Sequence, residues 1–270
     1  MAADGEARRR LRRRREARGI PLRSVAPNAV TALALCAGLT GIRFAIAAEW
    51  ELAVAMIMAA ALLDGIDGRV ARLLRGESRF GAELDSLADA ISFGVSPAII
   101  LYLWSLQAAP RIGWICALIY AVFCALRLAR FNARIDLVDQ PHKSAGFLTG
   151  VPSPPGAALA LLPLYLWLWT EAPVLRSPWV VAPWLALVAL LMVSSFATYS
   201  WGSFRLRRNI RFEVLVAVVA VGAAIISAPW PALSLLCVLY LLTLPFSASS
   251  YRRIRRLRAA SAPLGAPSVP

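Results

Sequence analysis

Four aspartates stand at regular spacings in one stretch of the chain. Asp64 and Asp67 are three residues apart, and Asp85 and Asp89 are four residues apart. In a helix, each of these spacings places both side chains on one face. Carboxylates with no histidine or cysteine nearby suit a hard divalent ion such as Mg²⁺ or Mn²⁺, and without a cation they would repel one another. The spacing therefore predicts a metal-holding pocket wherever two such helix ends meet.

Three small residues and one base accompany the aspartates: Gly68, Ala71, Gly81 and Arg72. A glycine inside a helix costs up to about 1 kcal/mol relative to alanine, so its presence indicates that something bulky approaches the backbone. Close packing of two helices is the alternative explanation. Arg72 follows Gly68 by one helical turn, where its guanidinium can meet a phosphate.

The chain around these residues has the composition of a membrane protein. It is 59% hydrophobic and 16% charged over 270 residues, and its mean hydropathy is +0.65. These values exclude a soluble domain and a disordered chain. The net charge of +14 suits either nucleic acid or anionic lipid headgroups, and the hydrophobicity favours membrane lipids and no nucleic acid. The four cysteines have no C-x-x-C spacing and are predicted to be free thiols.

Apolar runs predict an all-α membrane bundle of about eight transmembrane helices. A span needs about 20 residues, so the short apolar run 50–63 must continue as a helix to about Arg75. Asp64 and Asp67 then lie at its cytoplasmic end, and a turn near Gly76–Phe80 leads to a third helix that begins near Ala82. The predicted spans are 29–48, 50–75, 82–107, 113–133, 156–170, 182–200, 212–228 and 231–249.

The distribution of basic residues predicts the orientation of the spans. With the amino end inside, 26 of the 29 Lys and Arg residues fall on the cytoplasmic side, as the positive-inside rule requires. Both termini are then cytoplasmic. The predicted organisation is a basic tail at 1–28, a membrane domain at 29–250 with six core helices plus two, and a basic, then disordered tail at 251–270.

Together these residues resemble the CDP-alcohol phosphatidyltransferases. The chain matches every fixed position of that family's signature, which here reads Asp64-x2-Asp67-Gly68-x2-Ala71-Arg72-x8-Gly81-x3-Asp85-x3-Asp89. The resemblance implies transfer of a phosphatidyl group from a CDP-linked lipid to an alcohol, with release of CMP. It also implies that the four aspartates hold one or two divalent ions, with Asp89 at their edge acting as general base. The CDP part of the lipid would meet Asp64, the three small residues and Arg72.

Within the family, the flanking residues are similar to those of bacterial integral-membrane phosphatidylserine synthases. This similarity implies CDP-diacylglycerol and L-serine as substrates, a site facing the cytoplasm at the bacterial inner membrane, and a possible homodimer. Phosphatidylglycerophosphate synthases usually place Lys after the last aspartate, whereas Ala90 follows Asp89 here. Other acceptors remain alternatives: glycerol 3-phosphate, choline, inositol phosphate or a second lipid. The segments that carry the similarity are Pro27-Asn28-x2-Thr31, Phe80–Pro97, Arg127–Asn132, Gly150–Pro154 and Tyr199-Ser200.

The carboxylate of serine would need a cation close to the aspartates. Arg127 and Arg130 are three residues apart at the end of the fourth span, and Asn132 and Ser92 are further candidates for serine binding. The alternative for the two arginines is a role as positive-inside anchors. A divalent-cation transporter would also need an acidic cluster. The aspartates, however, lie on one side of the membrane beside Arg72 and have no counterpart in an inverted repeat.

Overall fold

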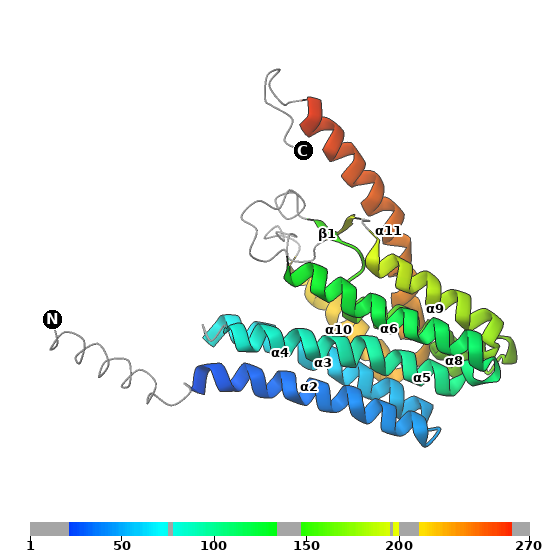
Figure 1. Cartoon of the computed structure of the whole chain (residues 1–270). Helices are drawn as coiled ribbons and strands as arrows, with labels where there is room; N and C mark the ends of the chain where they lie inside the picture. The colour runs from blue at the N-terminus through cyan, green and yellow to red at the C-terminus, as the bar shows by residue number, and fades with distance from the viewer. Residues whose placement is uncertain (1–21, 75–77, 134–146, 195–196, 200–210, 261–270) are drawn as a thin grey trace, which may run out of the picture.

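The computed structural model describes residues 22–74, 78–133, 147–194, 197–199 and 211–260. Most of the predicted amino-terminal tail and the last ten residues of the predicted carboxyl-terminal tail lie outside these ranges. The described chain is built almost entirely of helices (Figure 1). One pair of three-residue strands is the exception to the all-helical prediction. β1 (Phe147–Thr149) and β2 (Ala197–Tyr199) are antiparallel, with Phe147 opposite Tyr199.

The first two helices form an antiparallel hairpin. α2 (Leu22–Ile46) packs along the length of α3 (Trp50–Leu74). The helix α2 begins at Leu22, earlier than the predicted residue 29. Pro27 removes one backbone hydrogen bond near the start of the helix but does not end it. The helix α3 continues through the aspartate motif, as predicted, and its polar last turns extend beyond its apolar part.

The third predicted span consists of three consecutive helical segments. They are α4 (Arg79–Asp89), the π-helix η1 (Ala90–Val95) and α5 (Ser96–Trp104). The helix begins three residues before the predicted Ala82, because the Ser78 hydroxyl accepts a hydrogen bond from the Gly81 amide at 3.0 Å and caps the helix. The π-helical turn starts directly after Asp89. Single π-turns within α-helices are frequent at functional sites.

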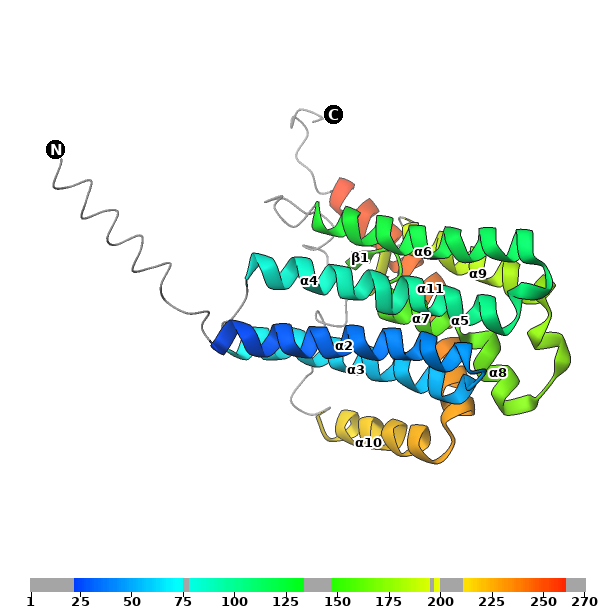
Figure 2. The same ribbon diagram turned by 60° about the horizontal axis from the view of Figure 1, so that its bottom comes forward.

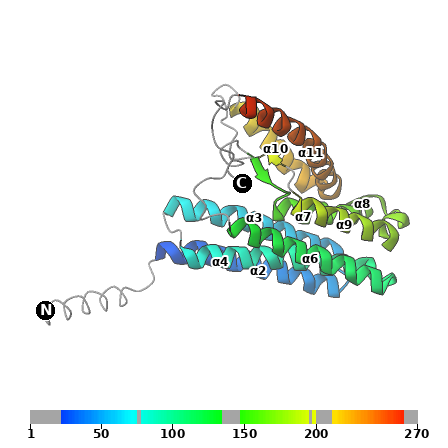
Figure 3. The ribbon, with the colours of Figure 1, turned by 45° about the horizontal axis from the view of Figure 1, so that its top comes forward.

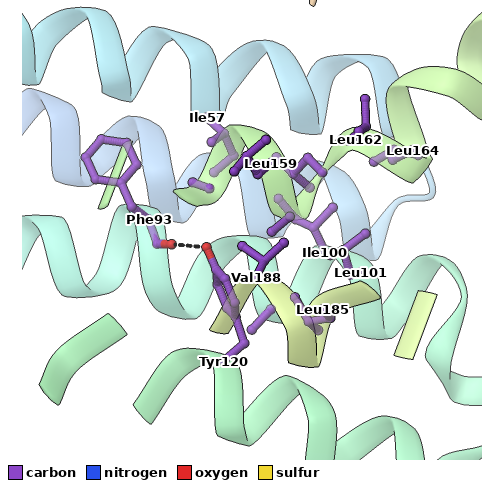
Figure 4. Packing of buried hydrophobic residues seen from close by; sticks show 14 of the residues in the cluster. Ile57, Phe93, Ile100, Leu101, Tyr120, Leu159, Leu162, Leu164, Leu185 and Val188 are labelled. Atoms are coloured by element: carbon purple, nitrogen blue, oxygen red, sulfur yellow. Dashed lines mark hydrogen bonds between the residues drawn. The ribbon is translucent and has the colours of Figure 1, made fainter. Parts of the chain in front are cut away.

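A proline in the middle of this helix is compensated by a hydrogen bond from a neighbouring helix. Pro97 has no N–H group and cannot donate to the Phe93 carbonyl. The Tyr120 hydroxyl donates to that carbonyl instead, at 2.9 Å (Figure 4). Phe93 and Tyr120 belong to a continuous buried apolar cluster. The contact therefore fastens the helix that carries Asp85 and Asp89 to its neighbour, α6 (Pro110–Asn132).

The remaining helices complete the bundle. α9 (Pro178–Val193) packs against α6, and it ends before the predicted residue 200 because the chain turns into β2. The predicted fifth span is divided at Leu161 into α7 (Ser153–Ala160) and α8 (Leu162–Thr170). Two short 3₁₀ helices, η2 (Leu106–Ala108) and η4 (Pro173–Arg176), lie at the opposite end from the aspartates, in the loops after α5 and after α8.

The last two helices differ in their contacts. α10 (Arg211–Ser227) lies beside α11 (Pro229–Ala260), as Figure 3 shows, and most of its side chains are exposed. α11 packs on α7 and α8 and continues past the predicted end at residue 249. The expectation that two helices lie outside the core therefore fits α10, whereas α11 is part of the packed bundle.

The described helices include three that are long and apolar enough to cross a membrane: Val25–Ile46, Arg79–Trp104 and Pro110–Asn132. Three shorter apolar helices accompany them: Pro178–Val193, Glu213–Ser227 and Pro229–Leu244. The chain is thus a membrane protein with a helical bundle. In Figures 1 and 2, α2, α3, α4 with α5, and α6 run side by side, so that the end of α3, the start of α4 and the end of α6 lie at the same end of the bundle.

Candidate active site

Three of the four aspartates meet where α3 ends and α4 begins. Carboxylate oxygens of Asp64, Asp67 and Asp85 lie within 4.8 Å of one another. The structure therefore brings together side chains that are up to 21 positions apart in the sequence, as the two helical spacings predict. The Asp85 carboxylate is repelled by both of the others. Three oxygen donors without histidine or cysteine in the group fit a hard divalent ion such as Mg²⁺ or Mn²⁺.

Asp67 is the most buried of these aspartates. It is 5% exposed, and its Oδ2 atom accepts a hydrogen bond of 2.7 Å from the Thr31 hydroxyl on α2. The same hydroxyl lies 3.1 Å from the Pro27 carbonyl. A hydroxyl has one proton to donate, so the Thr31 bond to Asp67 competes with a bond to its own helix. In the sequence, Thr31 is distinguished only by the family resemblance, since no spacing rule connects it with Asp67.

Asp89 lies at the edge of the three-aspartate group and is not one of its members. Its carboxyl group lies within hydrogen-bonding reach of Asp64 and interacts electrostatically with Arg127 on α6. Its Oδ1 atom is buried and has no hydrogen-bond partner among the described residues. Buried polar atoms almost always have a partner, so an orphaned carboxylate oxygen is a place where a ligand or a water is expected.

A cleft of about 240 Å³ opens beside the aspartates. It combines the carboxylates of Asp67 and Asp85 with the start of α2 and the start of α4. All three small residues of the signature line it, whereas Arg72 does not. The complete lining is Pro27, Asn28, Thr31, Asp67, Gly68, Ala71, Ser78, Gly81, Ala82 and Asp85.

The two signature glycines line the cleft for different reasons. A Cβ atom on Gly81 would lie 2.8 Å from the Asn28 Oδ1 atom and 3.1 Å from the Ser78 Oγ atom, so a larger residue there would displace the ends of these two side chains. A Cβ atom on Gly68 would meet no atom within 4 Å. Protein packing therefore does not require glycine at position 68, which leaves the approach of a ligand as its explanation. The Arg72 Nε atom donates to the Gly68 carbonyl at 2.9 Å, so the arginine lies against its own helix one turn from this point.

Arg127 is the predicted serine-binding residue that interacts electrostatically with Asp89. Its Nη1 atom donates to the Ser153 hydroxyl at 2.5 Å, at the start of α7. Its Nε atom is buried and has no partner among the described residues. Arg127 thus has an unpaired donor, and Asp89, with which it interacts electrostatically, has an unpaired acceptor.

The other predicted serine-binding residues make structural contacts elsewhere. Arg130 donates to the Val193 carbonyl at the end of α9 (3.3 Å). Asn132 donates to the Ser86 hydroxyl on α4 (2.8 Å). Ser92 is buried between η1 and α2, where its hydroxyl donates to the Ala34 carbonyl at 3.4 Å. These three residues connect helices, and neither they nor Arg127 line the cleft.

Comparison with known proteins gives a consistent family. A sequence model described as CDP-alcohol phosphatidyltransferase matches residues 24–194, which include the whole aspartate motif. A second model, described as CDP-alcohol phosphatidyltransferase 2, matches residues 209–245. Together the two matches cover α2 to α9 and most of α10 and α11.

Similar proteins from bacteria are named CDP-diacylglycerol–serine O-phosphatidyltransferase. The protein of Mycobacterium leprae is 40% identical over 229 residues, covering 84% of this chain and 76% of the relative. That of Mycobacterium tuberculosis strain H37Rv is 40% identical over 242 residues, covering 87% and 82%. That of Helicobacter pylori strain 26695 is 32% identical over 219 residues, covering 80% and 87%.

Proposed function

Because the chain belongs to the CDP-alcohol phosphatidyltransferase family, we propose that it transfers the phosphatidyl group of CDP-diacylglycerol to the hydroxyl of L-serine and releases CMP. The names of its relatives support serine as the acceptor. The observation that carries the proposal is the position of Asp89. Its buried Oδ1 atom is unpaired among the described residues, and its carboxyl group interacts both with Asp64 of the three-aspartate group and, electrostatically, with the Arg127 guanidinium.

The CDP-lipid enters the cleft beside the three-aspartate group. Its lining of Gly68, Ala71 and Gly81 leaves the backbone accessible to a flat or bulky group, which suits the cytidine and its phosphates. Arg72, one turn away on the exposed side of α3, can move from the Gly68 carbonyl to a phosphate oxygen. The apolar helices beside the cleft then hold the acyl chains of the lipid within the membrane.

Asp64, Asp67 and Asp85 are the residues that would hold a divalent metal ion, with Asp89 at their edge. Such an ion supplies charge neutralisation of the pyrophosphate and so makes CMP a better leaving group. Thr31 fixes one oxygen of Asp67 and leaves its other oxygen for the ion. A hydrogen bond of this kind orients a ligand before the metal binds.

Asp89 acts as the general base for the acceptor. The serine hydroxyl gives its proton to the Asp89 carboxylate while its oxygen attacks the lipid-side phosphorus. The bond between that phosphorus and the CMP oxygen breaks, and phosphatidylserine is formed. A hydroxyl is a weak nucleophile at neutral pH, so its deprotonation must accompany the attack.

Arg127, more than Arg130, is placed to bind the serine carboxylate. The Arg127 guanidinium has an unpaired Nε–H beside Asp89, whereas the Arg130 guanidinium is used at the end of α9. A carboxylate held by Arg127 would bring the serine hydroxyl toward Asp89. The proposal therefore assigns acceptor binding to Arg127 and a helix-connecting role to Arg130, Asn132 and Ser92.

The proposed setting is the bacterial inner membrane, with the aspartates at the cytoplasmic face. It includes eight spans, cytoplasmic termini and a membrane domain at 29–250 between two basic tails, as the apolar runs and the basic residues predict. It also includes a homodimer, as the family resemblance implies. The distribution of basic residues supports this orientation. Labelling of Arg79→Cys by an impermeant thiol reagent tests it: labelling from the cytoplasmic side alone is expected, and labelling from the outer side alone would refute it.

A panel of acceptors tests the proposed reaction. Membranes containing the protein receive CDP-diacylglycerol, Mg²⁺ or Mn²⁺, and one of L-serine, glycerol 3-phosphate, choline or inositol phosphate. Release of CMP is expected with L-serine, together with phosphatidylserine in equal amount. CMP release with another acceptor and none with serine would keep the family chemistry and reject the acceptor. No release with any of them would reject the transferase assignment itself.

A further inference from the structure

A third buried polar group, the hydroxyl of Tyr240, interacts with Arg127. Tyr240 lies on α11 and interacts electrostatically with Arg127. Its ring packs against the apolar core, whereas its hydroxyl is buried without a hydrogen-bond partner among the described residues. Cys237, one turn before Tyr240 on α11, donates to the Ala158 carbonyl of α7 at 3.5 Å, so α11 passes along the helix whose first residue, Ser153, accepts a hydrogen bond from Arg127. The unpaired atoms of the three side chains are Asp89 Oδ1, Arg127 Nε and Tyr240 Oη.

The chemistry of the three atoms is complementary to one kind of ligand. Arg127 Nε–H and Tyr240 O–H are donors, and Asp89 Oδ1 is an acceptor. A small molecule with a carboxylate at one end and a hydroxyl at the other would satisfy all three. One guanidinium and one neutral phenol match the single charge of a carboxylate, whereas a phosphate monoester carries up to two charges and would call for a further cation.

The packing of α11 makes such a contact reachable. The helix α11 lies on α7, whose first residue, Ser153, accepts the hydrogen bond from Arg127. Tyr240 lies outside residues 24–194, where the first family model matches, and inside residues 209–245, where the second one does. The helix thus adds a polar group to a site whose aspartates and arginine all come from the earlier part of the chain.

We propose that Tyr240 is a specificity-determining residue of the acceptor site, where its hydroxyl donates a hydrogen bond to the carboxylate of L-serine beside Arg127. The inference rests on the proposed function, since it takes L-serine as the acceptor. Binding of the carboxylate by two donors at a fixed distance from Asp89 places the serine hydroxyl, and no other part of the molecule, at the base. An acceptor that lacks a carboxylate would leave both buried donors unpaired.

The variant Tyr240→Phe tests this assignment because it removes the hydroxyl and keeps the ring. At saturating CDP-diacylglycerol, the KM for L-serine is expected to rise about tenfold or more, as for loss of a hydrogen bond to a charged group. The KM for CDP-diacylglycerol is expected to stay within about twofold of wild type. Tyr165→Phe is the matched control, because the Tyr165 hydroxyl on α8 is also buried and unpaired among the described residues but does not interact with Arg127.

A second measurement tests the carboxylate itself. Serinamide has the hydroxyl and ammonium of serine but a neutral amide in place of the carboxylate. Wild type is expected to prefer serine to serinamide, and Tyr240→Phe is expected to narrow that preference by lowering kcat/KM for serine alone. An unchanged serine KM in Tyr240→Phe, an equal rise in Tyr165→Phe, or an unchanged preference would overturn the role of Tyr240. Any of these three contrary results would leave the proposed function intact. A wild-type protein that forms no phosphatidylserine would overturn both the proposed function and the role of Tyr240.

Discussion

At the scale of single residues, Asp67 differs from the other aspartates because a neutral hydroxyl holds it. Its carboxylate is buried against α2 and accepts the hydrogen bond from Thr31. A buried carboxylate that has a donor is oriented, whereas one that has lost its donor is both misplaced and costly to bury. The arrangement makes Thr31 a positioning residue for the proposed metal site.

Thr31→Val should lower the affinity of the protein for the divalent ion. The change keeps the shape of the side chain and removes the hydroxyl, and loss of such a supporting bond typically lowers metal affinity by about 10- to 100-fold. The measurement is the concentration of Mg²⁺ or Mn²⁺ that gives half-maximal activity. Thr31→Ser should restore it. Thr40→Val, on the same helix, is the control, because the Thr40 hydroxyl bonds only within α2. An unchanged metal requirement in Thr31→Val would contradict the positioning role.

Asp89→Asn should separate binding from chemistry. The amide keeps the size of the side chain but cannot take a proton, and loss of a general base typically lowers the rate by about 10²- to 10⁴-fold. Binding of CDP-diacylglycerol should remain, as measured by displacement of a labelled CDP-lipid. Glu83→Gln is the control on the same helix, since Glu83 is exposed. Near-normal phosphatidylserine formation by Asp89→Asn would remove Asp89 from the role of base.

The residues of the site could be predicted from the sequence to different degrees. The aspartates share helical faces at short spacings, so their meeting could be inferred from the motif and from the turn that follows it. Thr31 and Tyr240 lie far from the motif in the chain, and only packing brings their hydroxyls to Asp67 and Arg127. Periodicity cannot reveal such contacts, because it describes one helix at a time.

At the scale of the helices, the end of α3 and the start of α4 determine the shape of the site. Ser78 caps α4 and fixes where Asp85 and Asp89 face. The π-turn η1 follows Asp89 directly. The sequence predicted one regular helix from Ala82, because neither a cap nor a π-turn changes the apolar pattern. The cap sets where the helix starts, and the π-turn changes the register of the side chains that follow Asp89.

Gly68→Ala should weaken binding of the CDP-lipid without weakening the fold. A Cβ atom at position 68 would meet no protein atom within 4 Å, although Gly68 is one of the residues that line the cleft. Alanine in a helix is favoured over glycine by up to about 1 kcal/mol, so the thermal stability should stay equal or rise. The KM for CDP-diacylglycerol should rise several-fold. Measured together, the melting temperature and this KM distinguish a ligand contact from a packing contact.

Gly65→Ala provides the matched control for this change. Gly65 is also on α3, and a Cβ atom there also meets nothing within 4 Å, but Gly65 does not line the cleft. Its variant should show the same small gain in stability and a wild-type KM for the CDP-lipid. Equal KM values in the two variants would show that Gly68 is not a ligand contact.

At the scale of the whole molecule, the bundle brings together side chains from six helices around the aspartates and Arg127. The helices α3 and α4 supply the aspartates, α2 supplies Thr31, and α6, α7 and α11 surround Arg127. Hydropathy predicted the helices and their order well, because long apolar runs are the strongest signal in a membrane protein. Hydropathy could not predict that α11 packs on α7, or that β1 and β2 pair as antiparallel strands.

The most direct test follows the phosphorus atom of the lipid. Purified protein receives CDP-diacylglycerol that is labelled in the phosphate attached to diacylglycerol, with L-serine, before and after removal of divalent ions by a chelator. The label is expected to appear in phosphatidylserine, with one CMP released per molecule, only when serine and a divalent ion are both present. Label that stays in CDP-diacylglycerol despite serine and added Mg²⁺ or Mn²⁺, or phosphatidylserine that forms at an undiminished rate after chelation, would contradict the account.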